Sequence, residues 1–89
     1  MGSYSLRIQS SAAKEIERIE PKKARRRIVA RIQGLATDPR PPGCEELAGA
    51  AERYRVRQGA YRIVYQVRDL ELVVVLVEVG HRSQVYKSR

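Results

Sequence analysis

The sequence predicts an α+β fold in which two N-terminal helices pack on a twisted, mostly antiparallel sheet of four or five strands. Apolar residues recur at helical spacing in the first half of the chain and alternate with polar residues in the second half. The 89 residues are enough for one small hydrophobic core. Together these observations predict the element order β-α-α-β-β-β-β.

The first half of the chain predicts one strand followed by two helices. Residues 4–9 alternate apolar and polar side chains, which is typical of a half-buried strand. Ser10 and Ser11 offer an N-cap for a helix that ends near Glu20, and Pro21 separates it from a second helix that reaches about Ala36. The second helix has an apolar stripe for the sheet and a basic face for solvent. The basic residues are Lys22, Lys23, Arg25, Arg26, Arg27 and Arg31.

The second half predicts the rest of the sheet. Residues 37–43 form a loop by composition, and residues 44–52 are expected to be an irregular connection with at most one helical turn. Residues 53–57 alternate strictly and residues 60–68 alternate again, with Val64 on the otherwise polar face and a turn at Gln58-Gly59 between the two segments. Residues 71–79 are apolar on both faces, which is typical of a central strand. We expect Gly80 to end this strand and residues 83–86 to add a short last one.

Strand alternation places three arginines together. If Tyr54 and Tyr61 face the helices, Arg55, Arg57 and Arg62 face away from them on adjacent strands. Neighbouring like charges repel, and a polyanion held across this face would relieve the repulsion. The alternative is that these arginines extend into water or pair with glutamates, for which the candidates are Glu45, Glu46 and Glu52.

A second group of polar residues follows the central strand. His81, Arg82, Tyr86 and Lys87 lie within seven residues, and loops beyond strand ends commonly hold functional groups. The alternatives are a surface histidine at a turn and a terminal tyrosine packed on the sheet edge.

Charge and composition narrow the class of protein. The net charge is +8, and fourteen of the eighteen basic residues are arginine, whose planar donors fit phosphate. We expect no membrane segment, and the absence of an N-terminal apolar stretch predicts a cytoplasmic protein. The single cysteine, Cys44, excludes an internal disulfide and a cysteine-based zinc site, and no ligand cluster predicts a metal or another cofactor.

Four segments of the chain, in this order, form a pattern: Tyr54-Arg55-Val56-Arg57, Gly59-Ala60-Tyr61-Arg62-Ile63-Val64-Tyr65, Val79-Gly80-His81-Arg82 and Val85-Tyr86. By this pattern the chain resembles the RelE-type toxins of bacterial and archaeal toxin–antitoxin systems, within the RelE/ParE superfamily. The resemblance covers nearly the whole chain and implies one toxin domain over residues 1–89.

This resemblance implies a toxin that cleaves mRNA in the ribosomal A site and arrests translation. It implies a cognate antitoxin, the ribosome and mRNA as partners, and DNA autoregulation only as a toxin–antitoxin complex. By position, Arg55 and Arg57 match the paired basic residues of the family on a strand, and we expect these two residues and Lys87 to bind phosphate. The resemblance assigns catalysis to Arg62, Arg82 and Tyr86, with His81 as a further candidate acid.

Two residues compete for proton transfer in this metal-independent reaction. Tyr86 could act as the base if surrounding cations lower its pKa, or could instead stack on a nucleobase. His81 has the better intrinsic pKa near neutrality. The family also leaves two other functions open: a ParE-like inhibitor of DNA gyrase without ribonuclease activity, and a degenerate member kept for antitoxin binding or DNA autoregulation.

Overall fold

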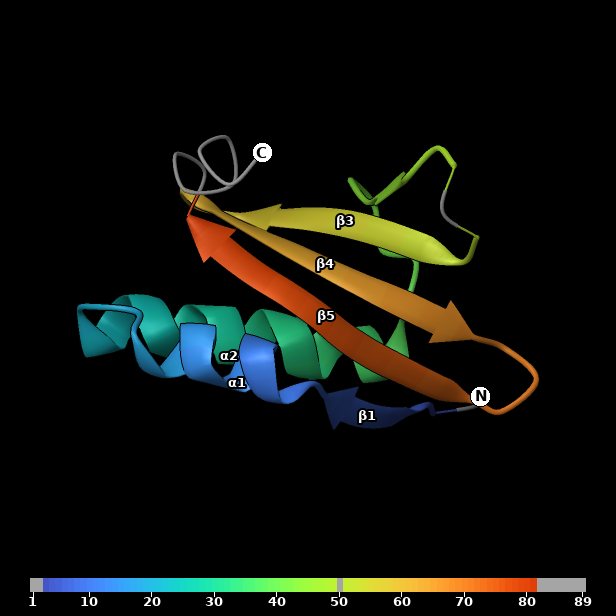
Figure 1. Ribbon diagram of the computed structural model, residues 1–89, viewed down its shortest axis with the longest axis horizontal. Helices are drawn as coiled ribbons and strands as arrows, with labels where there is room; N and C mark the ends of the chain where they lie inside the picture. The colour runs from blue at the N-terminus through green and yellow to red at the C-terminus, as the bar shows by residue number, and fades with distance from the viewer. Residues whose placement is uncertain (1–2, 50, 82–89) are drawn as a thin grey trace.

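The structure is a two-layer α+β fold, as the sequence predicts. The computed structural model describes residues 3–49 and 51–81. The elements are β1 (Ser5–Ile8), α1 (Ser10–Glu17), α2 (Lys22–Thr37), β2 (Glu45–Glu46), β3 (Arg53–Gln58), β4 (Tyr61–Arg68) and β5 (Val73–His81). Figure 1 shows both helices on one side of the sheet, below β5 in this view.

The five strands form one sheet in the order β1-β5-β4-β3-β2. Neighbouring strands are antiparallel except β1, which pairs in parallel with the first half of β5, from Ser5 opposite Val73 to Ile8 opposite Leu76. β5 therefore has a neighbour on both sides, which confirms the prediction of a central Val-rich strand.

The core lies between the helices and the inner face of the sheet. Both the apolar stripe of α2 and the alternate residues of β3 and β4 are buried, as predicted from the sequence. The fully buried members on these three elements are Ile28, Ile32, Leu35, Val56, Ile63, Tyr65 and Val67. Burial of alternate residues on β3 and β4 fixes which face of these strands points away from the helices.

The expectation of an irregular connection over residues 44–52 is wrong at Glu45 and Glu46. These two residues form β2, with Glu45 opposite Arg55 and Glu46 opposite Tyr54. Two residues are too few to show a strand period, so the pairing depends on β3 rather than on a local pattern. β2 is therefore one of the four late strands, and the strand expected at residues 83–86 lies outside the described residues.

Gly80 does not end β5. It pairs with Arg62, and the strand continues to His81, because the ladder with β4 supplies partners on that side to its end. β5 also begins two residues later than expected, after a turn in which Leu72 has a positive φ of 56°. A register shift at Val64/Tyr65 leaves Val77 as the extra residue of a β-bulge.

The first helix is also shorter than predicted. It runs from Ser10 to Glu17, and its N-cap is Gln9, without a capping side chain. The serines are helical because the Gln9 N–H still belongs to the sheet, donating to the Leu76 carbonyl, while the Gln9 carbonyl accepts from Ala13.

Candidate nucleic-acid interface

Three arginines lie on the face of the sheet that the helices leave uncovered. Arg55 and Arg57 belong to β3 and Arg62 to β4, and each alternates with a residue of the inner, helix-facing side. Arg57 and Arg62 are direct cross-strand partners, and Arg55 lies two residues along β3 from Arg57. We call Arg55, Arg57 and Arg62 the arginine face. Their shared face follows from the strand alternation read in the sequence.

Glu45 extends this face by one acidic group. Its carboxylate forms an ion pair with the Arg55 guanidinium, directly across from it in the β2–β3 ladder. The sequence offered three glutamates as partners for the arginines, and the structure confirms Glu45 as the partner of Arg55.

All three arginines lower the pKa of Glu45. Its pKa is lowered mainly by the hydrogen bond and charge of Arg55, and further by the charges of Arg57 and Arg62. The carboxylate therefore lies where the fields of all three guanidinium groups overlap. Such a position stabilises any anion, including a phosphate oxygen.

His81 lies on the other side of the sheet. It pairs with Tyr61 at the end of β5, and the two rings make an edge contact with centroids 5.3 Å apart and an interplanar angle of 87°. Arg62, the next residue along β4, is opposite Gly80 and faces away from the helices. Strand alternation thus separates the His81 ring from the arginine face.

The other site residues expected from the sequence lie outside the described residues. These are Arg82, Tyr86 and Lys87. Arg82 is the next residue after the end of β5.

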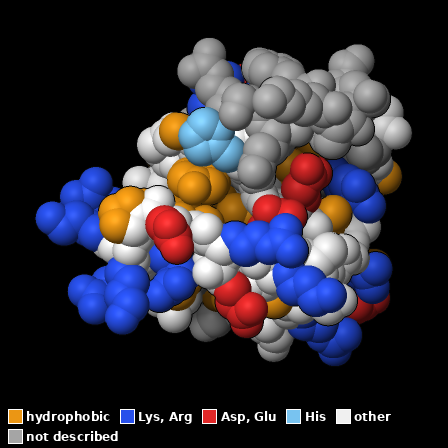
Figure 2. Space-filling model, turned by 60° about the vertical axis from the view of Figure 1, so that its left-hand side comes forward, with side chains coloured by type: hydrophobic (Ala, Val, Ile, Leu, Met, Phe, Trp, Pro, Cys, Tyr) orange, Lys and Arg blue, Asp and Glu red, His pale blue; other side chains and the backbone are white. Residues whose placement is uncertain are grey.

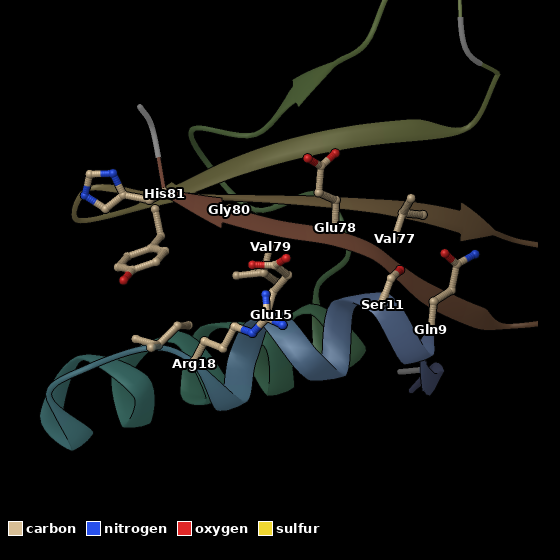
Figure 3. Close-up of a pocket in the computed structure, with 11 residues that line it drawn as sticks. Gln9, Ser11, Glu15, Arg18, Val77, Glu78, Val79, Gly80 and His81 are labelled. Atoms are coloured by element: carbon tan, nitrogen blue, oxygen red, sulfur yellow. The ribbon is translucent and has the colours of Figure 1, made fainter. Parts of the chain in front are cut away.

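A hollow of about 680 Å³ opens between α1 and the second half of β5. β1 pairs with β5 only as far as Leu76, so α1 rather than a strand lies beside the residues that follow. Figure 3 shows Glu15 of α1 and Arg18, the residue that follows this helix, on one side of the hollow and Val79 and His81 on the other. In Figure 2 the pale-blue histidine lies above an apolar surface with acidic and basic side chains around it. No pattern in the sequence indicates this hollow, because it depends on where β1 ends.

A polar cluster that no sequence pattern indicates fixes the start of β3. The Arg40 guanidinium donates to both carboxylate oxygens of Asp69, at 2.8 and 3.2 Å, and its Nε donates to the Tyr54 hydroxyl at 3.0 Å. The same guanidinium lies 5.1 Å from the centre of the Tyr54 ring, and the Tyr4 hydroxyl donates to Asp69 Oδ1 at 2.7 Å. Because Tyr54 precedes Arg55, the cluster holds the strand that bears two arginines of the arginine face.

The described part of the chain contains neither a group of metal-ligating side chains nor a membrane-spanning helix. No group of three or more His, Cys, Asp or Glu side chains there could hold a metal ion. No helix among residues 3–49 and 51–81 has the length and apolar character needed to cross a membrane.

Comparison with known proteins decides the family. The family model described as the ParE toxin of type II toxin–antitoxin systems matches residues 6–86. The chain belongs to this toxin family. Within it, the toxin is similar to proteins of the RelE type. Toxin RelG of Mycobacterium tuberculosis is 26% identical over 87 residues, which cover 94% of this chain and 97% of the relative.

Solved RelE structures share the fold of this toxin. The toxin–antitoxin complex RelBE2 from Mycobacterium tuberculosis contains a chain with a TM-score of 0.80 and 26% identity, covering 93% of this chain and 95% of that one. The isolated RelE toxin of Escherichia coli has a TM-score of 0.77 and 29% identity, covering 97% and 94%. The sequence-based identification as a RelE-type toxin is therefore confirmed.

Proposed function

We propose that this toxin is a ribosome-dependent mRNA endoribonuclease that cuts mRNA in the A site and so inhibits translation in the cytoplasm. The observation that supports this function best is the arginine face, where three guanidinium groups lie on adjacent strands of the uncovered side of the sheet. Arginine binds phosphate through paired, charge-assisted hydrogen bonds, as backbone recognition in RNA requires.

The proposed reaction needs neither a metal nor another cofactor. The 2′-hydroxyl loses its proton, its oxygen bonds to the adjacent phosphorus, and the bond from phosphorus to the 5′-oxygen breaks as that oxygen takes up a proton. The products are a 2′,3′-cyclic phosphate and a 5′-hydroxyl. Arg62 and Arg82 stabilise the additional negative charge on the phosphorane. Arg55, Arg57 and Lys87 hold the flanking backbone.

We propose Tyr86, in preference to His81, as the residue that transfers the proton. The His81 ring contacts Tyr61 on the helix side of the sheet, away from the arginine face. A group that moves a proton at the phosphate must come within hydrogen-bond reach of it. Arginine keeps its proton at neutral pH, so the arginine face can stabilise charge but cannot act as the base.

The proposed partners are a cognate antitoxin, the ribosome and mRNA. One of the similar chains comes from a solved toxin–antitoxin complex, RelBE2 of Mycobacterium tuberculosis. We propose that an antitoxin covers this toxin in the same way and that DNA autoregulation occurs only in the resulting complex.

The second candidate function is inhibition of DNA gyrase without ribonuclease activity. It is favoured by one observation, that the matching family model is the one described for ParE. The two candidates share a fold and differ in what the arginine face contacts.

Primer extension on a translated reporter mRNA after toxin induction separates these functions. We expect cuts at codon spacing with the wild-type toxin. Arg62→Ala should abolish them, because the phosphorane loses a charge-assisted donor worth about 10²-fold or more in rate. Arg68→Ala is the matched control, since Arg68 is exposed at the other end of β4, and it should retain the cuts.

Circular dichroism of both variants checks that they fold. Codon-spaced cuts that persist in folded Arg62→Ala would contradict the assigned site. Growth arrest with a DNA damage response and no mRNA cuts would establish the gyrase function instead.

A further inference from the structure

Glu45 is an acidic side chain built into the basic site. It lies on β2, a two-residue strand at the edge of the sheet, and stands directly opposite Arg55. Its carboxylate forms an ion pair with the Arg55 guanidinium. A carboxylate presents oxygens to a guanidinium much as a phosphate does, so it occupies Arg55 in the way that a phosphate would.

The position of Glu45 makes this contact reversible. Its side chain is 61% exposed, whereas that of Arg55 is 24% exposed. The carboxylate can therefore turn into water without opening the core, while Arg55 stays held against the sheet. An exposed ion pair of this kind is weak enough for another anion to replace it.

We propose that Glu45 is an internal competitor for the RNA backbone, which occupies Arg55 in the free toxin and must leave it when a phosphate binds. This inference rests on the proposed function, because it takes the arginine face to be where RNA phosphates bind. The depressed pKa of Glu45 agrees with it, since the carboxylate stays charged under the fields of Arg55, Arg57 and Arg62.

The competitor weakens binding to isolated phosphates and short RNA. A phosphate at Arg55 must first displace a covalently tethered anion, which is always present. An mRNA on a ribosome is held by several contacts at once. It must displace the Glu45 carboxylate only once, and its contacts elsewhere along the RNA offset the free energy lost in that step. Glu45 thereby favours engaged mRNA over stray polyanions.

The test measures binding of a single-stranded 2′-O-methyl RNA oligonucleotide, which cannot be cleaved, by fluorescence anisotropy. Glu45→Gln keeps the shape of the side chain and removes the competing charge. We expect the affinity to rise about two- to tenfold, the range that loss of an exposed ion pair and of one repulsive charge allows. Glu46→Gln is the matched control, because Glu46 is the other residue of β2 and lies opposite Tyr54.

The control separates competition from a general effect of net charge. Both variants gain one unit of positive charge, but only Glu45→Gln releases Arg55. Equal affinities for the two variants, or weaker binding by Glu45→Gln, would overturn the competition. Absence of binding by all three proteins would overturn the proposed phosphate face as well. Tighter binding by Glu45→Gln without mRNA cleavage would support the competition and refute only the ribonuclease activity.

Discussion

At the scale of single residues, Tyr65 shows how a polar group enters this small core. It is fully buried, its ring stacks on Tyr54 at a centroid distance of 5.9 Å, and its hydroxyl donates to the Pro39 carbonyl at 2.6 Å. Burial, together with the neighbouring Cys44, raises the pKa of this hydroxyl, so it remains a neutral donor at physiological pH. One hydrogen bond thus ties the loop after α2 to the middle of β4.

Tyr65→Phe should lower the free energy of unfolding by about 1–2 kcal/mol, because it leaves the Pro39 carbonyl without its donor in a buried place. Urea denaturation measures the change. Tyr61→Phe removes the same hydroxyl from a half-buried position on the same strand and should cost less. Equal decreases in the free energy of unfolding for the two variants would show that the hydrogen bond to the Pro39 carbonyl does not stabilise the fold.

At the scale of elements, the polar cluster of Arg40, Asp69, Tyr54 and Tyr4 links four separate parts of the chain. Tyr4 of the N-terminal segment and Arg40 of the loop after α2 both donate to the carboxylate of Asp69, in the turn after β4. Arg40 also donates to the Tyr54 hydroxyl at the start of β3. Hydrogen bonds from Arg40 and then from Tyr4 lower the pKa of Asp69 below its ordinary value of 3.8. A carboxyl group whose pKa is lower in the folded state stabilises the fold above its ordinary pKa. This stabilisation is lost as the pH falls through the lowered value.

Asp69→Asn should therefore destabilise the toxin near neutral pH and much less in acid. Urea denaturation at about pH 6 and about pH 3 gives the two differences from wild type, and we expect the gap to narrow at the lower pH. Glu71→Gln is the control in the same turn, since Glu71 makes only a 3.6 Å contact between exposed side chains with Arg68. A gap that stays constant with pH would mean that the charge of Asp69 has no part in stability.

The elements also show what the sequence could predict. The arginine face was predictable because strand alternation has a period of two and Val56, Ile63 and Tyr65 mark the buried side. β2 was not predictable, because two residues give no period. The position of His81 was missed for a related reason: Gly80 looks like a strand end until its partner Arg62 is known. Arg40 and Asp69 are 29 residues apart and meet only in the folded chain.

At the scale of the whole molecule, the net charge is +8, and two surfaces of the described part of the chain concentrate basic side chains. One is the arginine face, and the other is the basic side of α2, which the sequence suggested to be a solvated face. The salt dependence of RNA binding distinguishes them, because each phosphate contact to a single strand adds about 0.7 to the slope of log affinity against log salt.

Arg57→Gln should lower this slope by about 0.7, and Lys22→Gln on α2 should leave it unchanged. The measurement is a titration of the 2′-O-methyl oligonucleotide at salt concentrations from about 0.05 to 0.3 M, a range in which surface charges are progressively screened. A reduced slope for Lys22→Gln would place α2 in the RNA contact and extend the interface to the helical layer.

The parallel pairing of β1 with β5 has a consequence for how the toxin becomes active. It joins the first strand to the last described one, and β5 also forms the longest ladder with β4. Contacts so distant along the chain form late in folding, since the intervening loop must close first. A chain that stops before Val73 lacks β5, an interior strand of its sheet, and cannot present the arginine face. Incomplete synthesis of this toxin should therefore produce harmless fragments, so that toxicity begins only when translation has passed β5.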